Sequence, residues 1–300
     1  MSYSLFTIHR YVIEFKEFGQ PIYLIPFGDV HRFAPLCHVP KWLEFLEWAK
    51  KKERCYFLGM GDYDDLASTS EREVLTSRHL HESTKESLDE YYHKRTMNMV
   101  KEIEFMKNRL VGMVEGNHHS ELLSGITTSQ LMCEALKVKY LGVNSFIRLV
   151  FQYIGKSGQK RYGKAKLRSR SLDIWAHHGT GAARRAGNSM NKIQDMVDTA
   201  EADIYLMGHD HHKSASIINR MCLTEGKSSF HVVNKKVLLA RTGTFLKGYE
   251  PGKESYVAKA GYSPTDIGVV KIEITPRITH YENEEGHKSG NFYLDIHASI

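Results

Sequence analysis

The sequence of 300 residues predicts an α/β domain, and two patterns support that class. Five apolar segments have the pattern of buried strands, and each breaks into glycine and polar residues at its end; they are 22–31, 55–65, 109–119, 172–179 and 203–212. Amphipathic, helix-like stretches lie between them, at 39–54, 129–139 and 191–202. Strands that alternate with helices are typical of α/β folds, in which loops at the carboxyl ends of the strands form the site.

Three regions depart from this alternation. Residues 66–108 are polar and helix-favouring, which predicts a helical insertion after the second strand. Residues 144–176 have the pattern of a β-hairpin that turns between Gly155 and Gly158. Residues 213–300 are mainly β-like, with glycine-rich connections and no clear helix. Because no repeat, low-complexity tract or linker divides the chain, we predict a single domain over residues 1–300.

Composition excludes several classes of protein. An apolar content of 41% is enough for a sizeable core. The longest apolar runs are far shorter than a membrane span, and residues 1–18 alternate apolar with polar side chains instead of forming a signal-peptide core. The four scattered cysteines lack a C-x-x-C pair, so they indicate neither a thiolate metal site nor a disulfide framework. We therefore expect a cytoplasmic protein that does not enter a membrane.

Side chains of the metal-ligand type follow all five predicted strands. His209 and His211 sit two residues apart, so in an extended segment both imidazoles point to the same side. Any one motif alone could be a polar loop, but eight of the seventeen histidines fall in these five motifs. Oxygen and nitrogen donors without cysteine suit manganese, iron or zinc. The candidates are Asp29, His31, Asp62, Asp65, Asn117, His118, His177, His178, His209 and His211.

The order of these motifs resembles that of a known superfamily. The set D-x-H, G-D-x-x-D, G-N-H, H-x-G and G-H-x-H is similar to the calcineurin-like metallophosphoesterases, which include protein phosphatases, phosphodiesterases and Mre11-type nucleases. The motifs span residues 29–211, about two thirds of the chain. The resemblance implies two facing mixed β-sheets flanked by helices, with two metal ions at one edge.

The resemblance also implies a ligand for each position. Asp29, His31 and His211 would hold the first metal. Asn117, His209 and either His177 or His178 would hold the second, and Asp62 would bridge both, since a carboxylate can join two cations. The H-x-G spacing favours His177, and neighbouring strand residues point to opposite faces, so only one of the two histidines is expected to bind. Manganese is the favoured ion, with iron, zinc and nickel as alternatives.

Two further residues receive catalytic roles from the resemblance. His118 corresponds to a histidine that binds no metal, contacts the phosphoryl group and protonates the leaving oxygen. Asp65 corresponds to the carboxylate that orients this histidine, although Asp64 could exchange roles with it and Asp65 could instead cap a helix. Metal lowers the pKa of water from ~15.7 toward ~7 and so supplies hydroxide to attack phosphorus.

Besides the paired histidines of AHHG, the chain departs from the family pattern at two places. His119 stands where an acidic residue commonly follows G-N-H. The segments GDYDDLA and EGNHH lack the arginines of the protein serine/threonine phosphatases, which argues against that branch.

The distribution of basic residues indicates what kind of substrate the protein could bind. The net charge is +6, and residues 155–170 hold seven Lys or Arg and no acid. This stretch is either a solvated hairpin tip or an arm that follows a nucleic-acid backbone. Arg184 and Arg185 come soon after the fourth motif and could bind a substrate phosphate.

We therefore predict a binuclear metal-dependent phosphoester hydrolase, with a phosphodiesterase or nuclease acting on DNA or RNA as the first choice. A phosphatase of small nucleotides or phosphomonoesters is the alternative in the same class. An inactive scaffold that serves as a binding module is the alternative of another class, which the full set of ligands disfavours.

Overall fold

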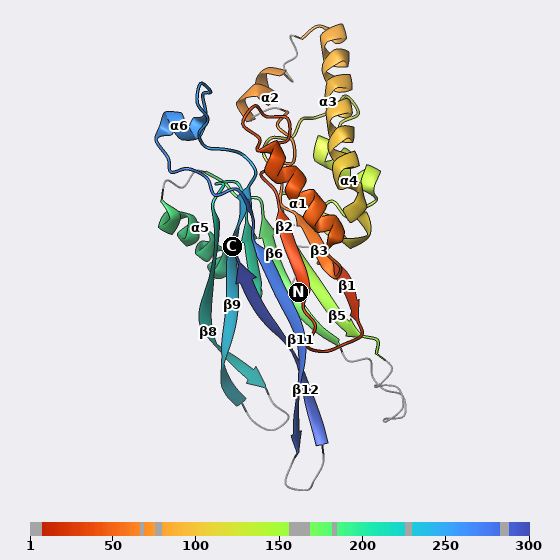
Figure 1. The fold of residues 1–300 in the computed structure, drawn as a ribbon, viewed down its shortest axis with the longest axis vertical. Coiled ribbons are helices and arrows are strands. Elements are labelled where there is room, and N and C mark those ends of the chain that lie inside the picture. Colours follow the sequence, from red (N-terminus) through yellow and green to blue (C-terminus); the bar gives the residue numbers. More distant parts are fainter. Residues whose placement is uncertain are drawn as a thin grey trace, which may run out of the picture.

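Two mixed β-sheets face each other, and helices cover their outer faces (Figure 1). The computed structural model describes residues 8–66, 69–75, 80–155, 169–181, 185–225, 230–282 and 288–300. The prediction of two facing mixed sheets flanked by helices is confirmed.

The five-stranded sheet contains three of the predicted strands as parallel neighbours. Its order is β12 (Lys288–Ser299), β11 (Lys271–Glu282), β2 (Ile22–Phe27), β3 (Cys55–Gly59) and β4 (Leu110–Met113). Strands β2, β3 and β4 run parallel, whereas β11 pairs antiparallel with both β2 and β12.

The seven-stranded sheet contains the other two predicted strands. Its order is β1 (His9–Phe15), β5 (Asn144–Tyr153), β6 (Ser169–His177), β7 (Ile204–Met207), β9 (Phe230–Thr244) and β10 (Gly268–Val269), and β8 (Lys213–Glu225) pairs with β9. Strands β6, β7 and β9 run parallel.

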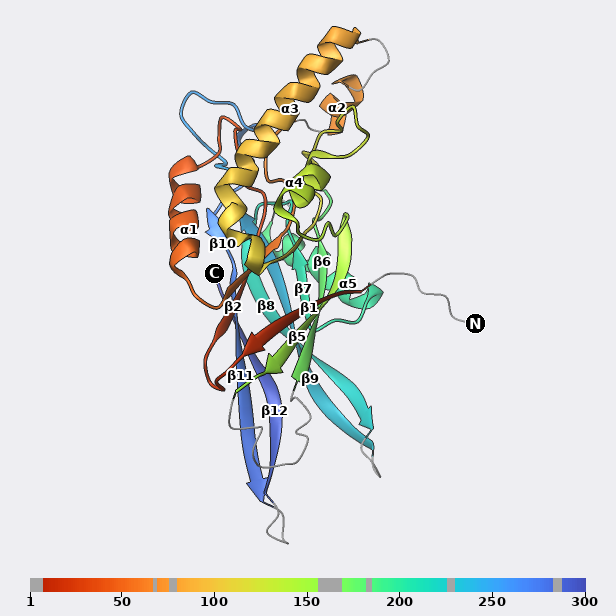
Figure 2. The same ribbon diagram turned by 90° about the vertical axis from the view of Figure 1, so that its right-hand side faces the viewer.

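The helices form the two outer layers. The described helices are α1 (Val39–Lys51), α2 (Thr69–Leu75), α3 (Glu82–Ile103), a 3₁₀ segment η1 (Glu104–Arg109), α4 (Thr128–Leu136), α5 (Ala186–Thr199) and α6 (Tyr256–Ala260). In Figure 1, α5 lies on the left and α1, α3 and α4 lie on the right, and Figure 2 shows α3 rising above the sheets with α2 beside its upper end. No helix among the described residues is both long and apolar enough to cross a bilayer.

Three apolar clusters match these layers. Leu24, Leu58, Leu149 and Ile174 belong to the cluster between the sheets. A second cluster joins α1, α3 and α4 to the outer face of the five-stranded sheet, and a third joins α5 to the seven-stranded sheet. Because the central strands are buried on both faces, they are apolar almost throughout, which is why the sequence marks them clearly.

The strand directions bring all five predicted motifs to one edge. Strands β2, β3 and β4 run parallel, and so do β6 and β7; the loops that follow both sets bring their ligand atoms within 4.8 Å of one another. The ribbons β8–β9 and β11–β12 extend toward the lower end of the molecule in Figure 1. Loops that follow parallel strands meet at their carboxyl edge, so the fold positions a site there.

The predicted hairpin and C-terminal region are present with two differences. Strands β5 and β6 pair antiparallel from Asn144–His177 onward, but the basic stretch at 156–168 lies outside the described residues. The β-rich region 213–300 contains the short helix α6, which the sequence does not predict. Ser255 caps α6, and Gly261 ends it in the left-handed conformation.

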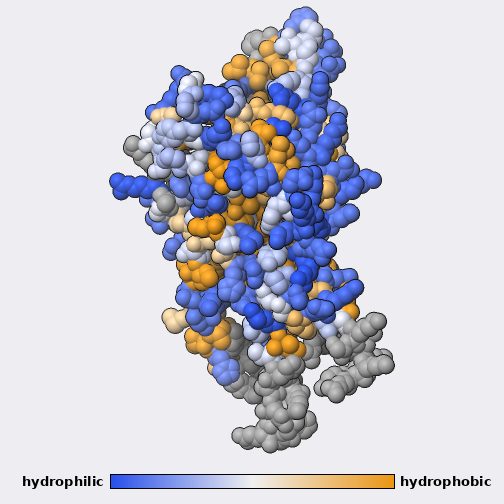
Figure 3. All heavy atoms as spheres, in the orientation of Figure 1, coloured by the Kyte–Doolittle hydropathy of each residue, from blue (hydrophilic) through white to orange (hydrophobic). Residues whose placement is uncertain are grey.

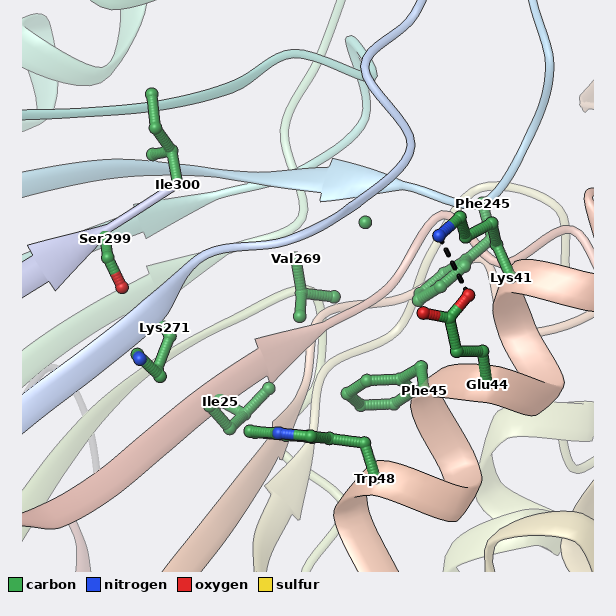
Figure 4. A pocket seen from close by; sticks show the side chains of 11 residues that line it. Ile25, Lys41, Glu44, Phe45, Trp48, Phe245, Val269, Lys271, Ser299 and Ile300 are labelled. Carbon is green, nitrogen blue, oxygen red and sulfur yellow. Dashed lines mark hydrogen bonds and ion pairs between the residues drawn. The ribbon is translucent and has the colours of Figure 1, made fainter.

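The surface also has an apolar hollow away from the motifs. In the view of Figure 3, apolar residues gather in a band between the lobe that carries α6 and helices α1 and α3. A hollow of about 320 Å³ lies between Phe45 and Trp48 of α1 and Val269 (Figure 4). Lys41 and Glu44 form an ion pair of 2.8 Å beside it.

Candidate metal centre

Side chains from the five strand ends converge into adjoining groups of potential ligands. The ligand atoms of Asp29, His31 and His211 lie within 4.8 Å of one another, and so do those of Asp62, His178 and His209. A third group joins His31, Asp62 and His118 under the same limit. The five-stranded sheet supplies Asp29, His31, Asp62 and His118 from the ends of β2, β3 and β4. The seven-stranded sheet supplies His178, His209 and His211 from the ends of β6 and β7.

The first group has the donors of a metal site in close contact. The Nε2 atoms of His31 and His211 are 3.1 Å apart, and Nε2 of His211 is 3.6 Å from Oδ1 of Asp29. That Oδ1 atom is buried and has no hydrogen-bond partner. Because an unpaired buried carboxylate oxygen is costly, a cation among these three side chains would stabilise it. The residues therefore fit a bound divalent ion.

The second group contains an amide oxygen. Oδ1 of Asn117 lies 2.9 Å from Nε2 of His178 and 2.8 Å from Nδ1 of His209. Nδ1 of His178 contacts the carbonyl oxygen of Met60 at 2.7 Å. A proton on Nδ1 satisfies that carbonyl and leaves the lone pair of Nε2 for a metal, which is the usual arrangement of a ligating histidine.

Asp62 lies between the two groups. Its Oδ2 atom is 3.2 Å from Nε2 of His178 and 3.8 Å from Nε2 of His31. Its Oδ1 atom accepts a hydrogen bond of 2.8 Å from the backbone N–H of His118. The carboxylate is thus fixed in orientation and faces both groups, as a bridging ligand must.

The protonation of two of the imidazoles, His209 and His211, suits metal binding. Burial lowers the pKa of His209 to about 4 and the pKa of His211 well below its usual range. Both rings are therefore neutral near pH 7, the form in which histidine binds metal. Burial raises the pKa of Asp29 to about 6, a shift that a nearby cation would reverse.

Backbone strain is concentrated at the same residues. Eight non-glycine residues in the described part of the chain have positive φ, and five of them are potential ligands: Asp29, His31, Asp62, His209 and His211, at 45°, 45°, 51°, 73° and 61°. Such conformations cost about 1–3 kcal/mol each and persist at functional sites. The strain marks these five loop positions independently of any motif.

Two glycines allow the loops to approach one another. A Cβ atom on Gly116 would overlap Oδ1 of Asp62, and one on Gly61 would lie 2.5 Å from Nδ1 of His178. Gly61 also has a φ of 97°. The glycines of the G-D and G-N-H motifs are therefore required by close contact.

The preference for His177 as a ligand is not supported, because the structure brings His178 to the centre instead. Ile174 and Ala176 belong to the cluster between the sheets, whereas Trp175 belongs to the outer cluster beneath α5. His178 continues the inward alternation, and His177 shares the outward side of Trp175. Nδ1 of His177 accepts a hydrogen bond of 2.7 Å from the backbone N–H of Gly179.

We expect His178→Asn to lower metal content and His177→Asn to leave it unchanged. Only His178 faces Asp62 and Asn117, so only its loss removes a donor from the centre. Elemental analysis after loading each purified variant with Mn²⁺ checks this difference. Metal loss in the His177 variant alone would return the assignment to His177.

His118 lies beside the groups and is oriented by Asp65. Its Nδ1 atom is 2.6 Å from Oδ1 of Asp65. Asp64 is buried, and none of the hydrogen bonds described for the imidazole of His118 comes from it. Burial lowers the pKa of His118, but the hydrogen bond with Asp65 and the charge of Asp62 more than offset this, so the pKa is raised overall.

The other predicted residues lie apart from the ligands. Nδ1 of His119 is 2.8 Å from the carbonyl oxygen of Gly116, and its Nε2 is 3.8 Å from Glu115. Arg185 is exposed at the start of α5 and does not line the cavity at the centre. Arg184 lies outside the described residues.

Two arginines that the sequence analysis missed hold the ligand loops. Arg241 of β9 is only 1% exposed; its Nε donates to Oδ1 of Asp210 at 3.0 Å and its Nη2 to the carbonyl of Gly208 at 2.8 Å. These contacts fix the loop that carries His209 and His211. The detectable signal is a lone arginine inside the apolar run VLLARTGTF. Arg72 of α2 similarly donates to the carbonyl of Asn117 at 2.6 Å.

We expect Arg241→Met to lower the free energy of unfolding by about 3–5 kcal/mol, because it removes the cation that pairs with the buried carboxylate of Asp210. The matched control is Arg148→Met, which breaks an exposed pair with Asp173 and should cost at most about 1 kcal/mol. Urea unfolding of both variants with EDTA present separates this effect from metal binding. Equal losses in the two variants would contradict the assignment.

A cavity of about 790 Å³ opens onto the centre. Asp62, His118 and His211 line it on one side. The segment 246–266, which contains α6, lines the other side and is called the α6 wall below.

Comparisons with known proteins give distant structural matches. No family model matches the sequence, and no curated protein does so either. A crystal structure of Vps29 from Chaetomium thermophilum is 11% identical, with a TM-score of 0.32 over 92% of this chain and 96% of that chain. A conserved uncharacterized protein of Streptococcus pneumoniae, described as a predicted phosphoesterase, is 13% identical, with a TM-score of 0.31 over 92% and 99%. With similarity this low, the description of the site depends on its own residues.

Proposed function

We propose that this protein is a binuclear metal-dependent phosphoester hydrolase. The observation that carries the proposal is the convergence of six oxygen and nitrogen donors from both sheets around Asp62, which faces two groups at once. The order of the motifs along the chain supports phosphoester chemistry, since it resembles that of the calcineurin-like metallophosphoesterases.

In this proposal, the two groups hold two divalent ions. Asp29, His31 and His211 hold the first, and Asn117, His178 and His209 hold the second, with Asp62 shared. Carboxylate, amide and imidazole donors without thiolate suit manganese first, and also iron, zinc or nickel. When bound, such ions neutralise phosphoryl charge and lower the pKa of water.

The residues around the ions have separate tasks. Asp62 keeps one fixed orientation, because the backbone N–H of His118 holds its Oδ1. Asp65 accepts a hydrogen bond from the Nδ1–H group of His118. His118 therefore presents its Nε2 atom to the cavity that it lines. A protonated Nε2 can donate to the leaving oxygen of the ester, and the raised pKa of His118 favours that form.

The test is a metal count combined with a hydrolysis assay. The protein is stripped with EDTA, reloaded with Mn²⁺ and assayed on p-nitrophenyl phosphate and bis(p-nitrophenyl) phosphate. We expect two ions per chain and metal-dependent release of p-nitrophenol from at least one ester. Two bound ions without hydrolysis would favour a binding module, and a folded sample without bound ions would refute the centre.

A further inference from the structure

The cavity at the metal centre has the size of a small-molecule site. Its volume of about 790 Å³ falls in the range of ~300–1,000 Å³ that is usual for such pockets. The lining beyond the metal ligands comes from Pro35 and Leu36 in the loop after β2, and from the α6 wall. Substrate specificity is therefore expected to depend on these two segments.

The α6 wall is held in place before any substrate binds. Thr265 Oγ1 donates to the carbonyl of Leu246 at 2.9 Å and accepts from the N–H of Gly248 at 3.0 Å. Lys253 Nζ donates to the carbonyl of Pro35 at 3.0 Å, which ties the wall to the loop opposite. A preformed wall recognises shape without the free-energy loss of ordering a loop on binding.

The charges that line the cavity disfavour a second phosphate. Its two lysines are each engaged by a carboxylate: Lys213 with Asp266 at 3.0 Å and Lys247 with Glu250 at 2.6 Å. No arginine of the described chain lines it, and the further acid Glu254 is paired with Lys259. A second phosphate would therefore find no lysine or arginine of the described cavity lining without a carboxylate partner. Apolar side chains are available there instead: Pro35, Leu36, Leu246, Val257 and Pro264.

The described strand ends on either side of the basic stretch lie away from the cavity. Strand β6 has nine residues and reaches the centre at His177. At about 3.3 Å per residue, its other end at Ser169 lies roughly 26 Å away. Gln152 pairs with Ser169 in the antiparallel ladder, so the described ends of both β5 and β6 next to the basic stretch lie far from the cavity.

We propose that the centre hydrolyses a compact phosphoester with a single phosphoryl group and an uncharged, ring-bearing ester arm, which the α6 wall covers. This inference rests on the proposed function. The phosphoryl group lies at the ligands and His118, and the ring packs on Leu36, Val257 and Pro264 across the cavity.

The test uses three phosphonates that cannot be hydrolysed, measured by calorimetry on the Mn²⁺-loaded protein. Phenylphosphonate should bind at least about tenfold more tightly than methylphosphonate. A roughly tenfold gain in affinity is the lower end of the range that an added apolar group gives in a pocket. 4-Carboxyphenylphosphonate should lose most of that gain. Asp266→Ala, a change at a side chain that is 68% exposed, frees Lys213 and should restore part of the binding of the carboxylated probe.

The matched pair of variants is Val257→Glu in the wall and Val232→Glu on the exposed ribbon β8–β9. Val257→Glu should reduce the preference for phenylphosphonate severalfold, whereas Val232→Glu should not change it. The inference is overturned if phenylphosphonate and methylphosphonate bind with equal affinity, or if Val257→Glu leaves the preference for phenylphosphonate unchanged. Either result leaves the proposed function standing. If a protein with two bound ions takes neither phosphonate, the proposed function itself fails.

Discussion

Asp62→Asn is expected to lose bound metal. Turnover should fall with the metal, by at least the ~10²–10⁴-fold that removal of an acid–base group causes. The asparagine keeps the shape of the side chain but removes its charge and one of its two acceptor oxygens. The Oδ2 atom of Asp62 faces both His31 and His178, so a neutral amide there weakens both sites together. Elemental analysis and p-nitrophenol release on the same preparation measure the two effects.

The control for Asp62 is Asp295→Asn, which changes a carboxylate on β12 that pairs with Arg277 on β11. This variant should retain two ions and full turnover. An Asp62→Asn protein that still holds two ions per chain would show that the carboxylate does not bridge the sites.

His118→Asn is expected to retain both ions and to hydrolyse its ester ~10²–10⁴-fold more slowly. Its ring is held by Asp65 and is assigned to no metal, so its loss removes a proton donor and leaves the donors of both groups in place. The loss should appear in kcat. It should be smaller for p-nitrophenyl esters, whose leaving group needs little protonation, than for an unactivated alkyl ester.

His119→Asn is the matched control for His118, since the neighbouring ring contacts Gly116 and Glu115 instead of the cavity. It should keep most of the turnover. If His118→Asn loses as much metal as Asp62→Asn, then His118 is a ligand, and the separation of roles is wrong.

The layers and the ligand loops could be predicted because the strands that carry them are buried on both faces. Such strands are continuous apolar runs, and each run ends where the chain turns polar at the edge of the sheet. The order of strands in the sheets does not follow from the sequence, because it depends on which runs pair across long distances. The distance between the centre and the end of β6 at Ser169 is a consequence of that pairing.

The choice between His177 and His178 required the face of β6 to be known. Both histidines end the same apolar run, and only the packing of Ala176 between the sheets and of Trp175 beneath α5 decides which one points inward. The sequence did not allow the α6 wall to be assigned to the site, for a different reason. Its residues are common loop residues, and their position opposite the candidate metal centre arises from hydrogen bonds to Pro35 and within the wall.

The centre draws its donors from two separately hydrogen-bonded sheets. Asp29, Asp62 and Asn117 follow strands of one sheet, and His178 and His209 follow strands of the other. Bound ions would therefore act as cross-links between the layers. By mass action, a ligand at 100 times its dissociation constant adds about 2.7 kcal/mol to stability. The lifetime of this protein among proteases would then follow the supply of its metal, so that metal starvation would remove the chain as well as its activity.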